Sequence, residues 1–554
     1  MKHRTYLVRL IFVVWFVAIV GRLGYWQFIK GGDLRRQADS EHLDSESLFA
    51  PRGQILASDG QPLVTNSQRY LFFVDPKLLP DDYKSLDRLF KVLEASESSK
   101  RLEEALKSEV SWFWIQRSLT PAQKKRIEDL KIAGLGFESE PVRLYPEGSS
   151  SAYLTGFVGR DSQGGPVGYF GLEGFYNRLL TGVDGRVSQE QDAFGRPILL
   201  SAPTRILPKA GRDLQTSVDR TLQYLATQKL IVGLEKYQAS SGTVSIMETQ
   251  TGRVLSLVSW PNYDPANFSQ YPGSLYTNPI VTEGYEPGST FKSIIMASAL
   301  DAGVLTKDTV CDACAGPVTI YDATVGSWNN KYYKDTNMTD VILHSDNVGM
   351  VFVSRKLGKT KMLDYIRRFG FGRLTGIDLQ EESTPVLKPD SDWFDIDWAT
   401  AAFGQGIAVT RIQMLAGVNA IANHGLWVQP RLVWQDGLTP QKSTPVISSK
   451  AADGITQMMI NGVQKGEVRY YKPAGYLIAG KTGTAQIPIQ GHYDKDKFIA
   501  SFVGFAPADN PRFTMLVTLT NPRSSPWGST TAAPLWFDIA REIFRYYQIP
   551  PTAK

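Results

Sequence analysis

The sequence is poor in cysteine, in histidine and in net charge. Its 554 residues include two cysteines and five histidines, and 60 Lys and Arg side chains nearly balance 55 Asp and Glu, leaving a net charge of +5. Two cysteines exclude a disulfide-dense scaffold, and so slight a charge argues against nucleic acid as the main partner. No internal repeat or long low-complexity segment is evident. The length predicts two or three globular domains.

The two cysteines lie close together in Cys311-Asp312-Ala313-Cys314. This spacing is compatible with a redox pair, half of a metal site or a small disulfide. A zinc site needs about four ligands, and no histidine lies nearby in the sequence. We therefore favour a structural disulfide outside the cytosol over a catalytic redox role.

An apolar run near the N-terminus predicts a membrane anchor. The run covers residues 10–21 and continues beyond Arg22 with aromatic side chains of the kind found at membrane interfaces. Its uninterrupted core is shorter than the roughly 20 residues of a spanning helix, but flanking arginines can reach the interface. No small-x-small cleavage site follows, which favours an uncleaved anchor over a signal peptide. The basic tail (Lys2, Arg4 and Arg9) predicts that everything after the helix lies outside the cytoplasm.

Residues 31–211 carry no recognisable chemistry. Short strand-like runs alternate with loops, and residues 77–130 are charge-rich with helical spacing of leucines. Neither a histidine cluster nor a phosphate-binding loop nor a paired-carboxylate motif is found there. We interpret this region as a structural or partner-binding module.

The stretch Glu286-Pro287-Gly288-Ser289-Thr290-Phe291-Lys292 precedes an apolar run of helical composition, residues 293–300. Its Pro-Gly pair breaks the preceding structure, so Ser289 is expected in the first turn of a buried helix with Lys292 on the same face. A serine hydroxyl becomes a nucleophile when a neighbouring base takes its proton, and a lysine can be that base if burial lowers its pKa. The alternative is structural, with Ser289 as a helix cap and Lys292 as a solvated side chain.

Two distant motifs favour the catalytic interpretation. Ser345-Asp346-Asn347 begins another apolar segment, and Lys481-Thr482-Gly483-Thr484 follows the strand-like residues 476–480. A rival Ser-x-Asn, Ser327-Trp328-Asn329, is flanked by Gly, Asn and Lys, as in a loop. Ser-x-x-Lys, Ser-x-Asn and Lys-Thr-Gly in this order are the signature set of penicillin-recognising serine enzymes. We expect folding to gather them into one cleft.

The region after residue 211 has strand candidates at both ends and helices between them. Thr249-Gln250-Thr251-Gly252 is a hairpin signal between two of the strands. This order predicts an α/β sandwich closed by long-range strand pairing. The predicted strands are residues 242–248, 253–260, 476–479, 498–505 and 512–519, and helices are predicted at 222–237, at 412–422 and from 534 onward.

These motifs resemble those of the class B penicillin-binding proteins, which are membrane-anchored peptidoglycan D,D-transpeptidases. The similarity covers nearly the whole chain and is most specific at residues 286–292, 345–347, 404–410 and 481–484. It also includes the Arg52-Gly53 turn, Tyr145-Pro146-x-Gly148, Gly171-Leu172-Glu173, Thr216-x-Val218-Asp219 and residues 259–265.

The resemblance implies an α/β multi-domain protein. Residues 1–28 would be a cytoplasmic tail and a single transmembrane helix, and residues 29–211 an elongated, non-catalytic α+β pedestal of the dimerisation type. Residues 212–554 would form the penicillin-binding transpeptidase fold, an antiparallel sheet flanked by helices. The compact pedestal and the sequence of residues 286–289 are more similar to the division-specific, FtsI-like branch than to the elongation branch. The sequence differs from the usual family pattern at Ser58, Glu248 and residues 529–531. These differences weaken the assignment to one branch but do not involve the expected catalytic residues.

The resemblance also implies acyl transfer in two steps. Ser289 attacks the D-Ala-D-Ala carbonyl of a stem peptide, with Lys292 as base and Ser345 relaying a proton to the leaving amine. The resemblance gives the other residues supporting roles. Asn347 fixes Lys292 and binds the substrate amide, and Lys481 supplies positive charge. Thr482 and Thr484 bind the substrate carboxylate, Gly483 leaves room for the peptide, and the backbone N–H groups of Ser289 and Thr484 form the oxyanion hole.

No metal or organic cofactor is implied. The expected ligands are peptidoglycan stem peptides on lipid II-derived glycan, and β-lactam antibiotics. The expected location is the bacterial cell (inner) membrane, with the catalytic domain on the periplasmic or extracellular side. A membrane glycan polymerase of the shape-elongation-division-sporulation class and other division proteins are the expected protein partners.

Three other functions use the same motifs: a D,D-carboxypeptidase, a β-lactamase and a β-lactam sensor. The anchor and the large non-catalytic module favour a wall synthase over a free lactamase. A Ser-His-Asp hydrolase is a further competitor, but none of the five histidines (His3, His42, His344, His424 and His492) lies in a Gly-x-Ser-x-Gly context. We interpret them as incidental.

Overall fold

The computed structural model describes most of the chain and begins with one long apolar helix. That helix, α1 (Lys2–Gly24), continues as the short π-helical segment η1 (Tyr25–Ile29). Residues Arg4–Ile29 form the one stretch, within the described part of the chain, that is long and apolar enough to cross a bilayer. The described residues are 2–34, 43–80, 83–93, 96–108, 110, 112–162, 164–190, 204–434, 443–489 and 492–551.

The chain divides into two compact units. The first contains Met1–Gly53 and Thr181–Arg212. Its sheet is antiparallel, with strand order β1 (Leu43–Leu48), β8 (Gly185–Glu190) and β9 (Thr204–Ile206). The second unit contains Gln54–Leu180 and Asp213–Lys554, so it includes the Ser-x-x-Lys, Ser-x-Asn and Lys-Thr-Gly motifs.

Within the second unit, residues 62–144 build three strands of a sheet and three α-helices. The long strand β3 (Pro62–Val74) pairs antiparallel with both β4 (Phe113–Leu119) and β5 (Leu135–Leu144). Residues 77–130, predicted from their spacing to be helical, therefore also contain a strand. Their helices are α3 (Tyr83–Leu93), α4 (Ser96–Leu106) and α5 (Pro121–Glu128), and the shared core includes Phe72, Leu89, Leu102, Ile115 and Ile127.

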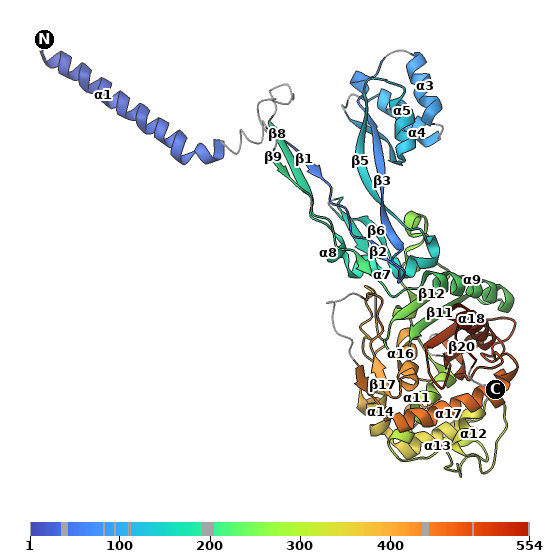
Figure 1. Ribbon diagram of the computed structural model, residues 1–554. Coiled ribbons are helices and arrows are strands. Elements are labelled where there is room, and N and C mark those ends of the chain that lie inside the picture. Colours follow the sequence, from blue (N-terminus) through green and yellow to red (C-terminus); the bar gives the residue numbers. More distant parts are fainter. Residues whose placement is uncertain are drawn as a thin grey trace. The chain divides into compact units, whose positions relative to one another are not determined.

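The C-terminal part of this unit is organised around a five-stranded antiparallel sheet (Figure 1). Its strands lie in the order β12 (Val254–Trp260), β11 (Ser241–Glu248), β21 (Phe513–Thr520), β20 (His492–Ala506) and β19 (Ala479–Ile489). Strands from the two sequence ends meet where Val244 lies opposite Val517. The predicted hairpin and the predicted antiparallel sheet flanked by helices are confirmed, and β19, which carries Lys481, is an edge strand.

Helices cover both faces of this sheet because neighbouring strand residues point to opposite sides. Phe502 packs with α9 (Arg220–Tyr237) and α18 (Ala532–Tyr546), whereas Val503 packs with the core on the other face. That second core is formed by α11 (Lys292–Asp301), α13 (Asn347–Leu357), α16 (Arg411–Ala422) and α17 (Ser449–Lys465). The three motifs therefore begin or border elements packed around a single hydrophobic core.

The predicted strand at 476–479 is wrong, because only its last residue belongs to β19. The Tyr476 ring instead stacks on Phe544 of α18 with centroids 3.9 Å apart, and its hydroxyl donates to the Ile549 carbonyl. The Lys481 motif consequently lies inside the strand and does not follow it. This position fixes the Lys481 backbone by pairing with β20 at Val503.

Candidate active site

Ser289 lies in a 3-10 turn, η6 (Gly288–Phe291), which leads into α11. Gly288 has a φ of +54° and donates its N–H to the Gly404 carbonyl at 3.0 Å. A Cβ on Gly404 would lie 2.1 Å from the Gly288 carbonyl oxygen, so the two glycines must pack backbone to backbone. This contact fixes the turn that presents the half-buried Ser289 to the cavity, just before α11.

Lys292 is fully buried, so the alternative of a solvated side chain is wrong. Its amine donates to the Ser345 carbonyl at 2.6 Å, to Asn347 Oδ1 at 2.7 Å and to Ser345 Oγ at 3.3 Å. Burial lowers the pKa of Lys292 well below its usual value, the charge of Lys481 lowers it further, and Asp346 opposes both. A lowered pKa favours the neutral amine, which is the form that can accept a proton.

Ser345 has a left-handed backbone, with a φ of +54°. It follows α12 (Met338–Leu343), whose end is closed by the Asp346 N–H donating to the Val341 carbonyl at 3.0 Å and by the Ser345 N–H donating to the Ile342 carbonyl at 3.2 Å. Glycine is the usual residue at this position of a helix end, and a serine there costs about 1 kcal/mol or more. The strained turn aims both the carbonyl and the hydroxyl of Ser345 at Lys292.

Asp346 and Asn347 begin the next helix, α13. Asp346 is its cap, because the carboxylate accepts from the Val348 N–H at 2.9 Å. Asn347 accepts from Lys292 and donates its own amide to the Gly326 carbonyl at 3.2 Å. Asp346 therefore builds the turn, while the side chain of Asn347 contacts Lys292.

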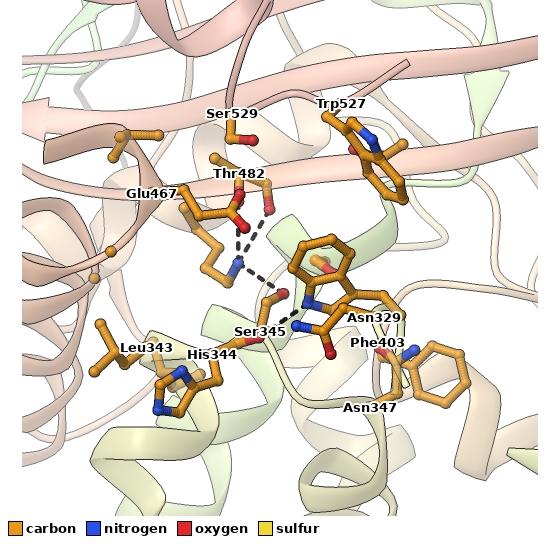
Figure 2. Close-up of a pocket in the computed structure, with 18 of the residues that line it drawn as sticks. Asn329, Leu343, His344, Ser345, Asn347, Phe403, Glu467, Thr482, Trp527 and Ser529 are labelled. Carbon is orange, nitrogen blue, oxygen red and sulfur yellow. Dashed lines mark hydrogen bonds between the residues drawn. The ribbon is translucent and has the colours of Figure 1, made fainter. Parts of the chain in front are cut away.

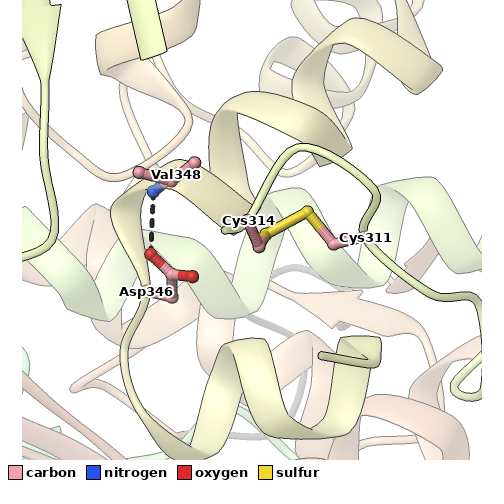
Figure 3. The surroundings of a disulfide bond; sticks show 4 residues. All are labelled: Cys311, Cys314, Asp346 and Val348. Atoms are coloured by element: carbon pink, nitrogen blue, oxygen red, sulfur yellow. Dashed lines mark hydrogen bonds between the residues drawn. A yellow bond between two sulfur atoms is a disulfide. The ribbon is translucent and has the colours of Figure 1, made fainter. Parts of the chain in front are cut away.

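The predicted disulfide joins Cys311 and Cys314, both of which are buried. Figure 3 draws it in the surroundings of Asp346 and Val348. The Cys311 N–H donates to the Thr336 carbonyl at 2.8 Å, just before Asn337 caps α12. The disulfide thus belongs to the loop that leads into α12, the helix before the Ser345 turn.

Lys481 stands on the edge strand opposite Ser345. Its amine donates to Ser345 Oγ at 3.0 Å, to the Thr482 carbonyl at 3.2 Å and to Thr482 Oγ1 at 3.4 Å. Burial lowers the pKa of Lys481 to about 8, and the Glu467 charge raises it against that trend. Ser345 Oγ therefore lies between two lysine amines, both with lowered pKa values.

A glycine is required at position 483 by the close approach of β19 to η6. A Cβ at this position would lie 2.3 Å from Ser501 Oγ, 2.9 Å from Thr290 Cγ2 and 3.0 Å from the Pro287 carbonyl oxygen. The close neighbours are protein atoms, so the glycine lets β19 pass beside η6. The next residue, Thr484, accepts from the Gly528 N–H at 3.0 Å, which leaves its own hydroxyl proton available to a ligand.

These groups meet in a cavity of about 630 Å³ (Figure 2). Ser289, Ser345, Asn347, Lys481, Thr482 and Thr484 all line it, and the buried amine of Lys292 reaches it through its bonds to Ser345 and Asn347. Sequence reasoning gave no role in the site to several further lining residues: Trp328, Phe403, Gln405, Glu467, Gln486 and Trp527. Trp328 and Trp527 lie with ring centroids 5.1 Å apart, as an aromatic wall of the cavity.

The second Ser-x-Asn sequence and two of the histidines make other contacts in the structure. In the rival Ser-x-Asn, Ser327 Oγ donates to Asn329 Oδ1 at 3.0 Å, so the pair closes its own loop. His344 stacks on Tyr333 with centroids 4.3 Å apart, and His424 faces Asp453 on the surface. His42 lies outside the described residues. Within the described part of the chain, no cluster of three or more His, Cys, Asp or Glu side chains is arranged to hold a metal ion.

Two family models and several known proteins match this chain. A family model described as the penicillin binding protein transpeptidase domain matches residues 242–545, and one described as the penicillin-binding protein dimerisation domain matches residues 47–216. Stage V sporulation protein D of Bacillus subtilis is 33% identical, over 99% of this chain and 86% of the relative. Peptidoglycan D,D-transpeptidase FtsI of Escherichia coli is 28% identical, over 97% of this chain and 90% of the relative.

Solved structures share the fold. Penicillin Binding Protein 2X from Streptococcus thermophilus superposes with a TM-score of 0.76 at 21% identity, covering 91% of this chain and 80% of that chain. Penicillin binding protein 3 from Mycobacterium tuberculosis, complexed with aztreonam, gives a TM-score of 0.70 at 25% identity, covering 92% and 99% of the two chains. The domain boundaries at residues 28 and 211 stay predictions.

Proposed function

Because this chain belongs to the class B penicillin-binding proteins, we propose that it cross-links peptidoglycan stem peptides through an acyl-Ser289 intermediate. The single observation that carries this proposal is the Ser345 hydroxyl held between the amines of Lys292 and Lys481, in the cavity that Ser289 lines. That arrangement supplies a nucleophile, a base and a proton relay within one site.

In the first step, Ser289 Oγ attacks the carbonyl of the D-Ala-D-Ala bond and its proton passes to Lys292. The carbon–nitrogen bond then breaks, and the leaving D-alanine amine takes a proton through Ser345. The Lys481 ammonium and the Thr482 and Thr484 hydroxyls would hold the terminal carboxylate by charge-assisted hydrogen bonds. The backbone N–H groups of Ser289 and Thr484 would stabilise the oxyanion, each contributing about 3–4 kcal/mol.

In the second step, an amine from a neighbouring stem peptide attacks the ester carbonyl. Its proton goes to Lys292, the ester carbon–oxygen bond breaks, and Ser289 regains its proton. The product is an amide cross-link. β-Lactams would acylate Ser289 in the same way as the first step.

The product distinguishes this function from the hydrolytic alternatives. Full-length protein in detergent would be given a D-Ala-D-Ala stem peptide and an excess of an amine acceptor, and the products would be identified by mass spectrometry. We expect a cross-linked peptide and one D-alanine for each new bond. Free acid as the only peptide product would indicate a carboxypeptidase, and absence of D-alanine would refute the proposed reaction.

We place the protein in the cell membrane, anchored by α1, with the catalytic unit outside the cytoplasm. A glycan polymerase of the shape-elongation-division-sporulation class and other division proteins are the proposed partners, and the division septum is the proposed place of work. A fluorescent fusion that marks the lateral wall instead of the septum would favour the elongation branch.

The two lysines predict a bell-shaped pH dependence of acylation. Lys292 must be neutral to act as base, so the rate rises as pH increases through its lowered pKa. Lys481 must be charged to attract a carboxylate, so the rate falls again around pH 8, where the pKa of Lys481 lies. The second-order rate constant for acylation by fluorescent penicillin, measured from about pH 5 to pH 10, tests this; a rate still rising at about pH 9 would contradict it.

A further inference from the structure

Glu467 lies where α17 ends, in the wall of the catalytic cavity. Gly466 stops the helix and donates its N–H to the Gly462 carbonyl at 3.2 Å, and Glu467 then begins the 3-10 turn η8 (Glu467–Tyr470). Buried Val468 anchors this turn, and Arg469 Nη1 donates to the Lys465 and Gly466 carbonyls, both at 3.3 Å. The backbone of Glu467 is therefore held in place next to β19, on which α17 packs.

Glu467 supplies the one carboxylate among the described residues that line the cavity. The cationic lining residues are Lys331, Lys465, Arg469 and Lys481. Figure 2 shows the Glu467 side chain next to Thr482, whose carbonyl and hydroxyl accept from the Lys481 amine. An isolated ammonium that is 5% exposed, as Lys481 is, loses its proton readily unless a counter-charge lies close.

We propose that Glu467 is a positioning residue for acylation, whose carboxylate keeps the Lys481 ammonium charged so that it can hold the substrate carboxylate. The proposal rests on the function proposed above for Ser289 and Lys481. Glu467 does not touch the reacting atoms; it acts through Lys481. The motifs of the sequence give it no role.

The charges that face Lys481 come from four places, and they divide into opposing sets. From α17 and η8 come Glu467, which favours the ammonium, and the cations Lys465 and Arg469, which line the same cavity. Lys292 of α11 is an opposing amine, and Asp346 in the turn before α13 acts on Lys292. The remaining titratable groups of the cavity lie on the α12 side and its preceding loop: Lys331, Tyr333 and His344.

The direction of the effect follows from these charges. Burial lowers the pKa of Lys481 to about 8, and the Glu467 charge raises it. Loss of that charge would let the pKa of Lys481 fall further, so the alkaline limb of acylation would move to lower pH. The acidic limb, which reports protonation of Lys292, would stay in place because Lys481 is still charged there.

The test is the pH profile of acylation of full-length Glu467→Gln in detergent, measured with fluorescent penicillin. We expect the alkaline midpoint to move down by about half to one pH unit, with the acidic limb unchanged. Glu467→Asp, which keeps the charge, is the matched control and should keep the midpoint near that of the wild type.

An alkaline midpoint of Glu467→Gln within about 0.2 pH unit of the wild type would overturn the proposal, even if the overall rate falls. A merely structural role lowers the rate at every pH and moves neither limb. If the wild type itself is not acylated, the proposed function fails first, so the two failures are distinguishable.

Discussion

Ser289→Ala is expected to abolish covalent labelling of the full-length protein by fluorescent penicillin. The hydroxyl is the only atom of that side chain that can form the ester, so no slower version of the same step remains. The fold should persist, because the turn is held by the Gly288–Gly404 backbone contact and the 3-10 helix, not by the Ser289 hydroxyl. Gel fluorescence after denaturation measures the covalent label, and circular dichroism checks the fold.

Ser293→Ala is the matched control for that variant. Ser293 lies four residues after Ser289, in α11, is buried, and donates its hydroxyl to the Thr290 carbonyl at 2.7 Å. It should keep its label, although loss of this bond costs about 1 kcal/mol of stability. Labelling of Ser289→Ala at the wild-type level would remove Ser289 as the nucleophile.

Lys292→Met is expected to slow acylation by about 10²–10⁴-fold, the range for loss of a general base. Methionine fills much of the same buried volume and leaves no unpaired charge, but it cannot take the Ser289 proton. It also leaves the Ser345 carbonyl and Asn347 Oδ1 without the donor they share, which costs about 1–3 kcal/mol for each unsatisfied group.

Stopped-flow acylation rates, compared at equal fractions of folded protein, measure the Lys292 effect. Lys356→Met, an exposed change near the end of α13, controls for loss of a lysine and should acylate like the wild type. An acylation rate of Lys292→Met within about tenfold of the wild type would assign the base to another group, and Lys481 would be the next candidate.

The sequence was sufficient for the family, the fold class and the transpeptidase assignment, which are confirmed. The reason is chemical: each motif is short, so the spacing of its own side chains is set by a few residues of chain, as for Ser289 and Lys292, which lie three residues apart. Such short-range relations survive folding unchanged. The residue roles in catalysis stay predictions, although the structure brings the named side chains into one cavity.

What the sequence could not give depends on long-range contacts. Residues 476–479 have strand-like composition, but the Tyr476 ring stacks on Phe544 of α18. The start of β19 is set by its pairing with β20. The left-handed backbone of Ser345 directs its carbonyl to the Lys292 amine. A motif of side chains cannot predict this backbone hydrogen bond. Glu467 enters the cavity only because Gly466 ends α17 beside the edge strand.

The most direct test of the account is to locate the acyl group in the wild-type protein. Full-length protein would be incubated with benzylpenicillin, digested with trypsin and mapped by tandem mass spectrometry. A single penicilloyl group on Ser289, within the peptide 254–292, is the predicted result. A penicilloyl group on any other side chain, or a protein that stays unmodified, would contradict the claim that this cleft uses Ser289 to form an acyl-enzyme.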